Sequence, residues 1–147
     1  VNDGRHLIEL VAYDKAGNAF KTFISVTIDN TPPILKVIQP AQGATIENTT
    51  ITVTWSVNDT TSGIAKLEIS VNGGPWTDMT NKTSYTIKDL TEGSHTIKIR
   101  ATDKAGNTAE KQTTFAVKLP IPYIGIGIAI AVIAITAIAA LLIKRRR

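Results

Sequence analysis

The chain has 147 residues, enough for one ordinary domain with additional segments. It carries 16 Lys and Arg against 12 Asp and Glu, and four of the basic residues form the terminal run Lys144, Arg145, Arg146 and Arg147. The remaining basic residues balance the acidic ones, so the charge does not predict a nucleic-acid partner, which would need basic groups clustered on a folded face. With no Cys in the chain, disulfides, thiol nucleophiles and thiolate metal sites are excluded.

The first 30 residues resemble a later part of the same chain. The pentapeptide Asp-Lys-Ala-Gly-Asn occurs at Asp14–Asn18 and again at Asp103–Asn107. Residues 4–28 align with residues 93–117, which pairs His6 with His95 and keeps apolar residues at alternate positions. We therefore expect residues 1–30 to be the last two strands of a preceding domain of the same type, so that either the natural protein is longer than this chain or the reading frame is truncated.

Residues 31–118 show the alternation of half-buried antiparallel strands. Trp55 lies on the apolar face of one such segment, and His95 on that of another. Turn-forming residues separate the segments, and no stretch before Tyr123 has convincing helical periodicity. Strands are expected at 34–38, 51–57, 65–71, 76–79, 84–87, 95–101 and 108–118. About seven short strands at this spacing predict an all-β fold, an antiparallel β-sandwich.

Several segments carry a family resemblance. The stretch DLTEGSHTIKIRATDKAGNTAE resembles the penultimate strand and final turn of fibronectin type III and bacterial Ig-like repeats, and TVTWSV resembles their second strand with its core Trp. IDNTPPIL resembles the joint between consecutive repeats of prokaryotic surface proteins. The resemblance covers residues 1–118 and implies an Ig-like or fibronectin III-like sandwich. Such sandwiches host many roles, so the resemblance alone implies no particular ligand.

The repeated pentapeptide has two interpretations. Asp accepts hydrogen bonds from backbone amides in turns and Gly tolerates positive φ, so a hairpin turn is the favoured interpretation. The alternative is a calcium joint, which needs roughly six to eight oxygen ligands. The last strand must run toward the C-terminal segment, so Asp103 should face the joint near Asp29, with Asp59 in reach. We expect residues 31–118 to fold without metal, and no other metal or cofactor site is expected.

The sequence offers no catalytic constellation. His6 and His95 occupy equivalent positions in two repeats, which favours packing at the core or its rim over chemistry. No Gly-x-Ser-x-Gly motif, phosphate loop or carboxylate pair stands out, so the chain is not expected to be an enzyme. Trp76 is an aromatic residue in a loop that either contacts a glycan or caps the core. Three sequons, at Asn48, Asn58 and Asn81, fall in predicted loops and are candidate glycosylation sites.

A membrane segment is predicted next to the C-terminus. Residues 123–143 form an apolar run, and at about 1.5 Å per residue a helix of this length matches the ~30 Å hydrocarbon core. The basic residues 144–147 should act as a stop-transfer signal and stay cytoplasmic, which leaves residues 1–118 outside. Gly125 and Ala129, and likewise Gly127 and Ala131, have a spacing that permits helix contact.

The predicted organisation is therefore a partial repeat (1–30), a complete sandwich (31–118), a transmembrane helix with a Pro-containing lead (119–143) and a cytoplasmic tail (144–147). The predicted function is an extracellular stalk of a bacterial or archaeal cell-surface protein, anchored in the lipid bilayer and presenting a distal module for adhesion or binding to protein or glycan partners. Two alternatives remain. One is the anchor of a surface hydrolase whose catalytic domain lies elsewhere. The other is a processed anchor, because LPIPY followed by a helix and KRRR resembles a sortase-like signal without its Thr-Gly pair.

Overall fold

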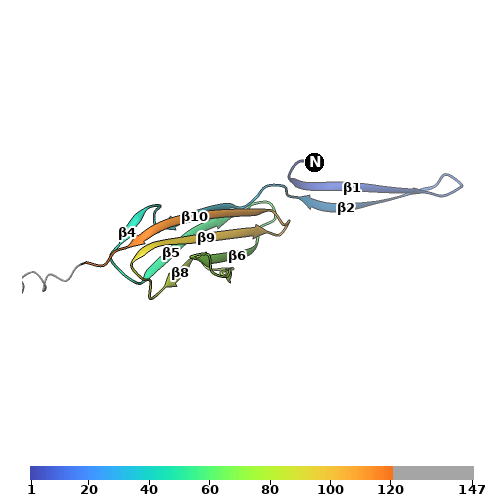
Figure 1. Ribbon diagram of the computed structural model, residues 1–147. Coiled ribbons are helices and arrows are strands. Elements are labelled where there is room, and N and C mark those ends of the chain that lie inside the picture. The colour runs from blue at the N-terminus through green and yellow to red at the C-terminus, as the bar shows by residue number, and fades with distance from the viewer. Residues whose placement is uncertain (121–147) are drawn as a thin grey trace, which may run out of the picture.

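The computed structural model describes residues 1–120, and all of their regular structure is β (Figure 1). Strands β1 (Gly4–Tyr13) and β2 (Ala19–Ile28) form a separate antiparallel hairpin, and the other eight strands form a sandwich. Among residues 1–120 there is no helix of sufficient length and apolar character to cross a membrane. The predicted membrane segment (123–143) and basic tail (144–147) lie outside the described residues.

Two sheets make up the sandwich. One has the order β3-β5-β8 and the other the order β4-β10-β9-β6-β7. All pairs are antiparallel except β4 and β10, which run parallel. The strand bounds are β3 Ile34–Gln39, β4 Ala44–Ile46, β5 Ile51–Asn58, β6 Ile64–Val71, β7 Thr77–Asp78, β8 Ser84–Ile87, β9 Gly93–Asp103 and β10 Thr108–Val117.

The core lies between the two sheets and follows the period-two pattern of the sequence. Trp55 on β5 is 3% exposed and Phe115 on β10 is 2% exposed. The indole Nε1 of Trp55 donates a hydrogen bond to the Lys82 carbonyl oxygen over 3.0 Å, so its polar atom is satisfied. The other buried apolar residues are Leu35, Ile51, Val53, Leu67, Ile69, Met79, Ile87, Leu90, Ile97, Ile99, Ala101 and Val117. The prediction of an all-β sandwich is therefore confirmed.

The structure differs from the sequence-based expectation in two places. The sandwich has eight strands rather than about seven, because β4 (Ala44–Ile46) adds a short parallel strand beside β10. Three residues are too few to show an alternating pattern. In addition, Glu68 and Ser70 are buried although they alternate with the inward residues of β6. The segment after β6 folds back over this outer face, where Ser70 Oγ donates to the Gly74 carbonyl oxygen over 2.6 Å.

Glu68 is buried together with its charge partners. Arg100 Nη2 lies 2.9 Å from Glu68 Oε2, and Lys66 Nζ lies 2.6 Å from Glu68 Oε1. The hydrogen bond from Lys66, followed by that from Arg100, lowers the pKa of the Glu68 carboxyl below its ordinary value. A carboxylate in this position stabilises the folded chain as long as it stays ionised.

The hairpin exposes the face that its repeat counterpart buries. In the aligned repeat, Ile8 corresponds to Ile97 and Leu10 to Ile99. Ile8 is 50% and Leu10 57% exposed, whereas Ile97 and Ile99 have no exposed surface. Figure 1 shows why: no second sheet covers β1 and β2, which project from one end of the sandwich.

This difference yields a matched pair of predictions. Ile97→Ala should lower the free energy of unfolding of the sandwich by about 2–5 kcal/mol, because it leaves a cavity between two sheets. Ile8→Ala should change it by less than about 1 kcal/mol, because that side chain is half exposed. Denaturant titration followed by tryptophan fluorescence measures both, since Trp55 lies in the sandwich core. Equal losses in the two variants would contradict the exposed hairpin face.

The Glu68 pair predicts an acid dependence. Since the pKa of Glu68 is lowered in the folded chain, its stabilisation is present above the unfolded pKa near 4.5 and is lost as the pH falls through the folded pKa. Glu68→Gln should cost about 1–2 kcal/mol near pH 7 and give a shallower loss of stability between pH 5 and pH 3. Thermal unfolding across this range tests it. The control is Glu110→Gln, which breaks the exposed pair with Lys98 and should behave like the parent chain.

Candidate functional site

Both copies of the repeated pentapeptide form the same hairpin turn, as the favoured interpretation predicted. Asp14 accepts hydrogen bonds from the Asn18 backbone amide (2.9 Å) and side-chain amide (2.7 Å). Asp103 accepts the same two bonds from Asn107, over 2.8 Å and 2.9 Å. Gly17 and Gly106 have φ angles of +88° and +95°, which residues with a side chain rarely adopt. The Asn18 bonds also lower the pKa of the exposed Asp14.

The two repeats also hold their exit segments in the same way. Asp3 Oδ1 accepts hydrogen bonds from the backbone and side-chain amides of Asn30, each 2.8 Å long, and Asp3 Oδ2 accepts one from the Thr31 hydroxyl. At the aligned position, Glu92 Oε1 accepts a 2.7 Å bond from the Leu119 amide. The Thr31 bond, followed by the Asn30 bonds, lowers the pKa of Asp3. Each repeat therefore fixes the segment that leaves its last strand.

We call residues 29–33 the joint, because they connect the hairpin to the sandwich. The sandwich contacts the joint through Asn107, whose Nδ2 donates a 3.1 Å hydrogen bond to the Asp29 carbonyl oxygen. The hairpin contacts it through Asp3, as described above. The joint backbone is thus hydrogen-bonded from both sides, and Pro32 and Pro33 further restrict its dihedral angles.

Three carboxylates meet at the joint, and we call them the carboxylate cluster. One oxygen from each of Asp29, Asp59 and Asp103 lies within 4.8 Å of the others. Asp103 is 2% exposed. Asp29 is half-buried as a whole residue, but its carboxylate is buried, and Asp59 is half-buried. The structure therefore brings together the three residues named for the calcium alternative.

Backbone amides orient two of these carboxylates. Asp59 Oδ1 accepts hydrogen bonds from the amides of Thr61, Ser62 and Gly63, between 2.8 and 3.1 Å long. The Gly63 bond is the largest cause that lowers the pKa of Asp59. Asp29 Oδ1 accepts a 3.1 Å bond from the Thr31 amide. Its Oδ2 is buried and has no hydrogen-bond partner in the described part of the chain.

His95 is a packing residue at the rim of the core. Its ring is 6% exposed and stacks on Phe115, with centroids 5.5 Å apart. Asn72 Oδ1 accepts a bond from the Thr96 amide, so Asn72 Nδ2 donates to His95 Nδ1 over 3.0 Å. This places the ring proton on Nε2, which donates to the Thr91 carbonyl oxygen over 2.8 Å. The interpretation of His95 as a core or rim residue is confirmed, and His6 makes the equivalent bond to the Asn2 carbonyl oxygen over 2.7 Å.

The Arg100 side chain covers the ring of Trp76 from one side. The Arg100 guanidinium carbon lies 4.3 Å from the centre of the Trp76 ring, and Arg100 is at the same time paired with Glu68. Trp76 is not among the side chains that pack against the core, so the cation–π contact places it over Arg100 on the outer face of the sheet and does not support the core-capping role.

The three sequon asparagines are exposed. Asn48 and Asn81 lie in loops, whereas Asn58 is the last residue of β5 and pairs with Ile34 on β3. The expectation that all three lie in loops is therefore wrong for Asn58, because β5 extends one residue beyond the apolar alternation.

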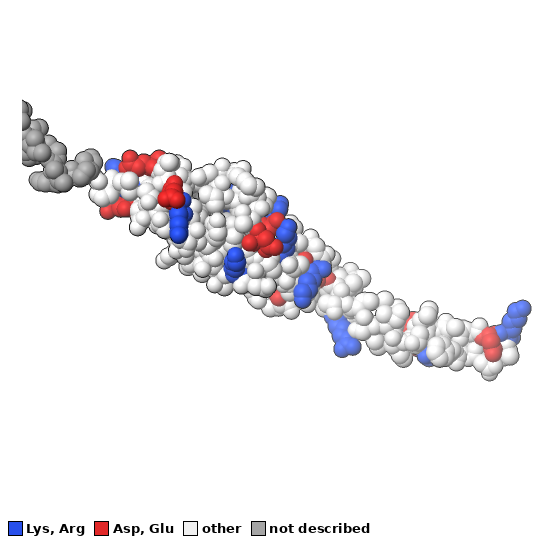
Figure 2. All heavy atoms as spheres, turned by 90° about the horizontal axis from the view of Figure 1, so that it is seen from below, with Lys and Arg blue, Asp and Glu red and all other residues white. Residues whose placement is uncertain are grey.

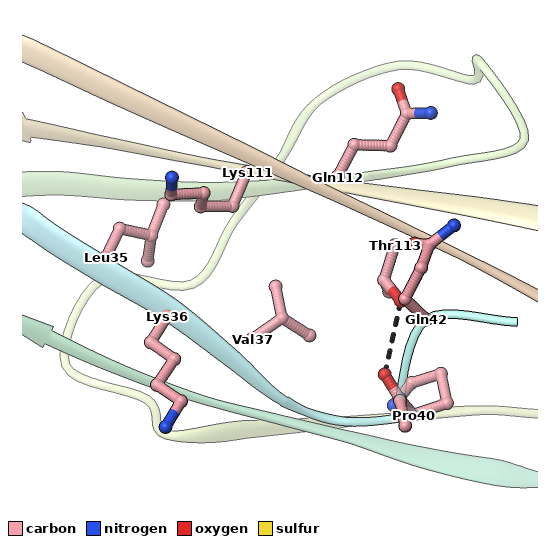
Figure 3. Close-up of a pocket in the computed structure, with 9 residues that line it drawn as sticks. Leu35, Lys36, Val37, Pro40, Gln42, Lys111, Gln112 and Thr113 are labelled. Carbon is pink, nitrogen blue, oxygen red and sulfur yellow. Dashed lines mark hydrogen bonds between the residues drawn. The ribbon is translucent and has the colours of Figure 1, made fainter. Parts of the chain in front are cut away.

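Two surface depressions of the sandwich add no further ligand site. One, drawn in Figure 3, lies between β3 and β10 and has a volume of about 240 Å³, below the size typical of ligand pockets. Across it, Thr113 Oγ1 donates to the Pro40 carbonyl oxygen over 3.2 Å. A wider depression of about 460 Å³ lies beside Ile38 and Ile46. Neither is lined by a carboxylate or a histidine, and the titratable groups of the first are Lys36 and Lys111.

Charges on the face shown in Figure 2 are scattered. Basic and acidic side chains alternate along the sandwich, and most of the hairpin surface is uncharged. The face shown has no continuous basic patch of the kind that binds nucleic-acid phosphates.

Some contacts of the two exit segments and of the joint were not expected from the sequence. The bonds from Asp3 to Asn30 and from Glu92 to Leu119 span 27 residues each and follow no local motif. The available signal was the repeat itself, since extending the alignment by one residue pairs the two acidic side chains. The sequence carried a weaker signal for the hydrogen bonds that Asp59 accepts from its own loop, because Asp59 is followed by Thr-Thr-Ser-Gly.

Comparisons with known proteins agree with this fold. Residues 33–99 match the family described as Bacterial Ig domain. Halomucin of Haloquadratum walsbyi (strain DSM 16790 / HBSQ001) is 33% identical over 95 residues, which is 61% of this chain. The chain spans about 1% of the length of that protein.

Two solved structures are similar. The fibronectin(III)-like modules of Clostridium thermocellum CbhA are 22% identical, with a TM-score of 0.51, and the match covers 60% of this chain and all of that one. The PKD1 domain of Vibrio anguillarum Epp is 15% identical, with a TM-score of 0.49, over 63% of this chain and all of that one. The first of these similarities supports the fold alone. The sandwich thus has an Ig-like, fibronectin III-like fold, and domains with this fold are typically non-catalytic.

Proposed function

We propose that this chain is the membrane-proximal part of an extracellular stalk that holds a distal adhesion or binding module away from a cell membrane. The observation that carries the proposal is the end-to-end path of the chain through the sandwich. The chain enters at the joint, where the β9–β10 turn contacts Asp29, and leaves after β10 at the opposite end (Figure 1). Ten extended residues of β10 span roughly 33 Å, so one sandwich lengthens the path by about that distance.

The hairpin supports a stalk of several such domains. It reproduces the turn, the histidine contact and the exit-segment contact of β9 and β10. It also exposes the apolar face that β9 and β10 bury against the second sheet. An isolated hairpin is marginally stable in water, so this face fits a second sheet of the same kind. We infer that residues 1–30 complete another Ig-like domain and that domains of this type are arranged in series.

The anchor in this proposal rests on the sequence. Residues 123–143 have the length and composition of a transmembrane helix, and the basic tail that follows sets its orientation. The similarity to Bacterial Ig domains and to Halomucin supports an Ig-like repeat of a prokaryotic surface protein. Residues 1–118 would then face the outside, with the lipid bilayer as the immediate partner and protein or glycan partners at the distal end.

Insertion into vesicles tests the anchor. The full 147-residue chain, reconstituted into liposomes, should resist extraction with alkaline carbonate. Proteinase K added outside should digest the outward-facing molecules to a protected fragment of roughly 25–30 residues that contains residues 123–143, because a bilayer shields about 20 helical residues.

The matched control is the double variant Ile133→Lys, Ala137→Lys, since each lysine at the centre of a span costs about 2.5–3.5 kcal/mol of insertion. It should be extracted by carbonate and leave no protected fragment. If the parent chain were extracted as completely as this variant, the membrane-anchored stalk would be ruled out.

A further inference from the structure

The carboxylate cluster has the composition of a binding site for a hard cation. Its three groups offer carboxylate oxygens alone, which suit calcium and magnesium rather than the softer transition metals. One oxygen from each of Asp29, Asp59 and Asp103 lies within 4.8 Å of the others, a spacing that lets a single ion contact all three. Close carboxylates repel one another, and this repulsion is strongest where water is excluded.

The cluster holds a buried oxygen that no group within residues 1–120 satisfies. Among residues 1–120, two buried side-chain oxygens lack a hydrogen-bond partner, Asp29 Oδ2 and Ser62 Oγ. Asp29 belongs to the cluster and Ser62 to the loop that Asp59 closes. A buried carboxylate oxygen without a partner is costly, so its presence points to a ligand that supplies the missing contact.

Among residues 1–120, no basic side chain supplies that contact. The ion pairs of residues 1–120 involve Glu9, Glu68 and Glu110, and none involves the cluster. Lys104 is nearby, with its Nζ 3.8 Å from the position that a Cβ on Gly63 would occupy, yet it forms no ion pair with the three carboxylates. Glu68 shows the contrast, because it is a buried carboxylate that has two basic partners.

We propose that the joint binds one Ca²⁺ through the carboxylates of Asp29, Asp59 and Asp103. Calcium accepts six to eight oxygens in flexible geometry, whereas magnesium demands a near-ideal octahedron. Three carboxylates whose remaining ligands are water molecules fit the flexible coordination of calcium better than the strict octahedron of magnesium. An open depression of about 220 Å³ beside the joint is lined by Thr31, Asp59 and Thr61 among others, and it gives the ion a route to the site.

The ion would connect two structural units. Asp29 follows the last strand of the hairpin, while Asp59 follows β5 and Asp103 is the last residue of β9 in the sandwich. A bound ion therefore restrains the angle between the hairpin and the sandwich. The role of this restraint in stiffening a stalk rests on the proposed function. At the aligned position after β10, Lys118 replaces Asp29, so the second exit segment lacks the corresponding ligand.

Calcium titration of the full chain in detergent micelles tests the proposal. Isothermal titration calorimetry of the calcium-stripped protein should show one Ca²⁺ per chain, with a Kd of roughly 10⁻⁵–10⁻³ M, the range of sensor and extracellular sites. Calcium at about 100 times the Kd should raise the Tm by roughly 10 °C or more relative to EDTA. No heat and no Tm shift up to 10 mM calcium would overturn the proposal.

Matched variants separate a ligand from a structural residue. Asp29→Asn keeps the oxygen that accepts the Thr31 amide but removes the charge. It should weaken calcium binding at least tenfold and leave the Tm in EDTA unchanged or higher, since it relieves repulsion. Asp14→Asn is the control, because Asp14 has the same turn contacts as Asp103 but lies outside the cluster, and it should bind calcium like the parent chain.

Parent-like calcium affinity in Asp29→Asn would overturn the proposal, as would a Tm in EDTA that falls as much as the Tm in calcium. Insertion into liposomes is measured without calcium. A chain that inserts but binds no calcium therefore refutes this inference alone, and one that binds calcium but fails to insert refutes the anchored stalk alone.

Discussion

The hydrogen bonds to the joint are the interaction on which the arrangement of this molecule depends. A connecting segment of five residues would ordinarily leave its ends free to reorient, because ordering each residue costs about 1–2 kcal/mol. Here Asp3 holds Asn30 and Thr31 from the hairpin side, and Asn107 holds the Asp29 carbonyl from the sandwich side. With Pro32 and Pro33 following, few rotatable bonds remain unrestrained.

The same contacts explain why acidic groups gather at this end of the sandwich. The turn that presents Asn107 to the joint is held by Asp103, and the loop beside it is held by Asp59. Each carboxylate thus has a local structural task, and the packing of the joint then brings both next to Asp29. The joint is acidic because Asp59 and Asp103 hold the loop and the turn beside it. The same two carboxylates, together with Asp29, supply the oxygen atoms that a cation would need.

Much of the sandwich could be predicted from the sequence, because its strands bury one face and so alternate in hydrophobicity. The inward positions of Trp55, His95 and Phe115 follow directly from this pattern. Strand β4 could not be predicted, since three residues carry no period, nor could the burial of Glu68, which depends on a loop that folds back over β6. The direction of the last strand was enough to place Asp103 near Asp29. The contacts of Asp3 and Glu92 could not be predicted from the alternation, because long-range hydrogen bonds between exposed polar residues follow no periodicity.

A fixed joint between the hairpin and the sandwich is the central claim, and a distance distribution across the joint tests it most directly. The chain has no cysteine, so the exposed positions Thr27 on β2 and Lys88 after β8 can be changed to cysteine and spin-labelled in the full chain. Pulsed electron paramagnetic resonance should give one narrow distance distribution, which Asp3→Ala should broaden by freeing Asn30 and Thr31. A broad distribution in the parent chain, unchanged by Asp3→Ala, would contradict the account.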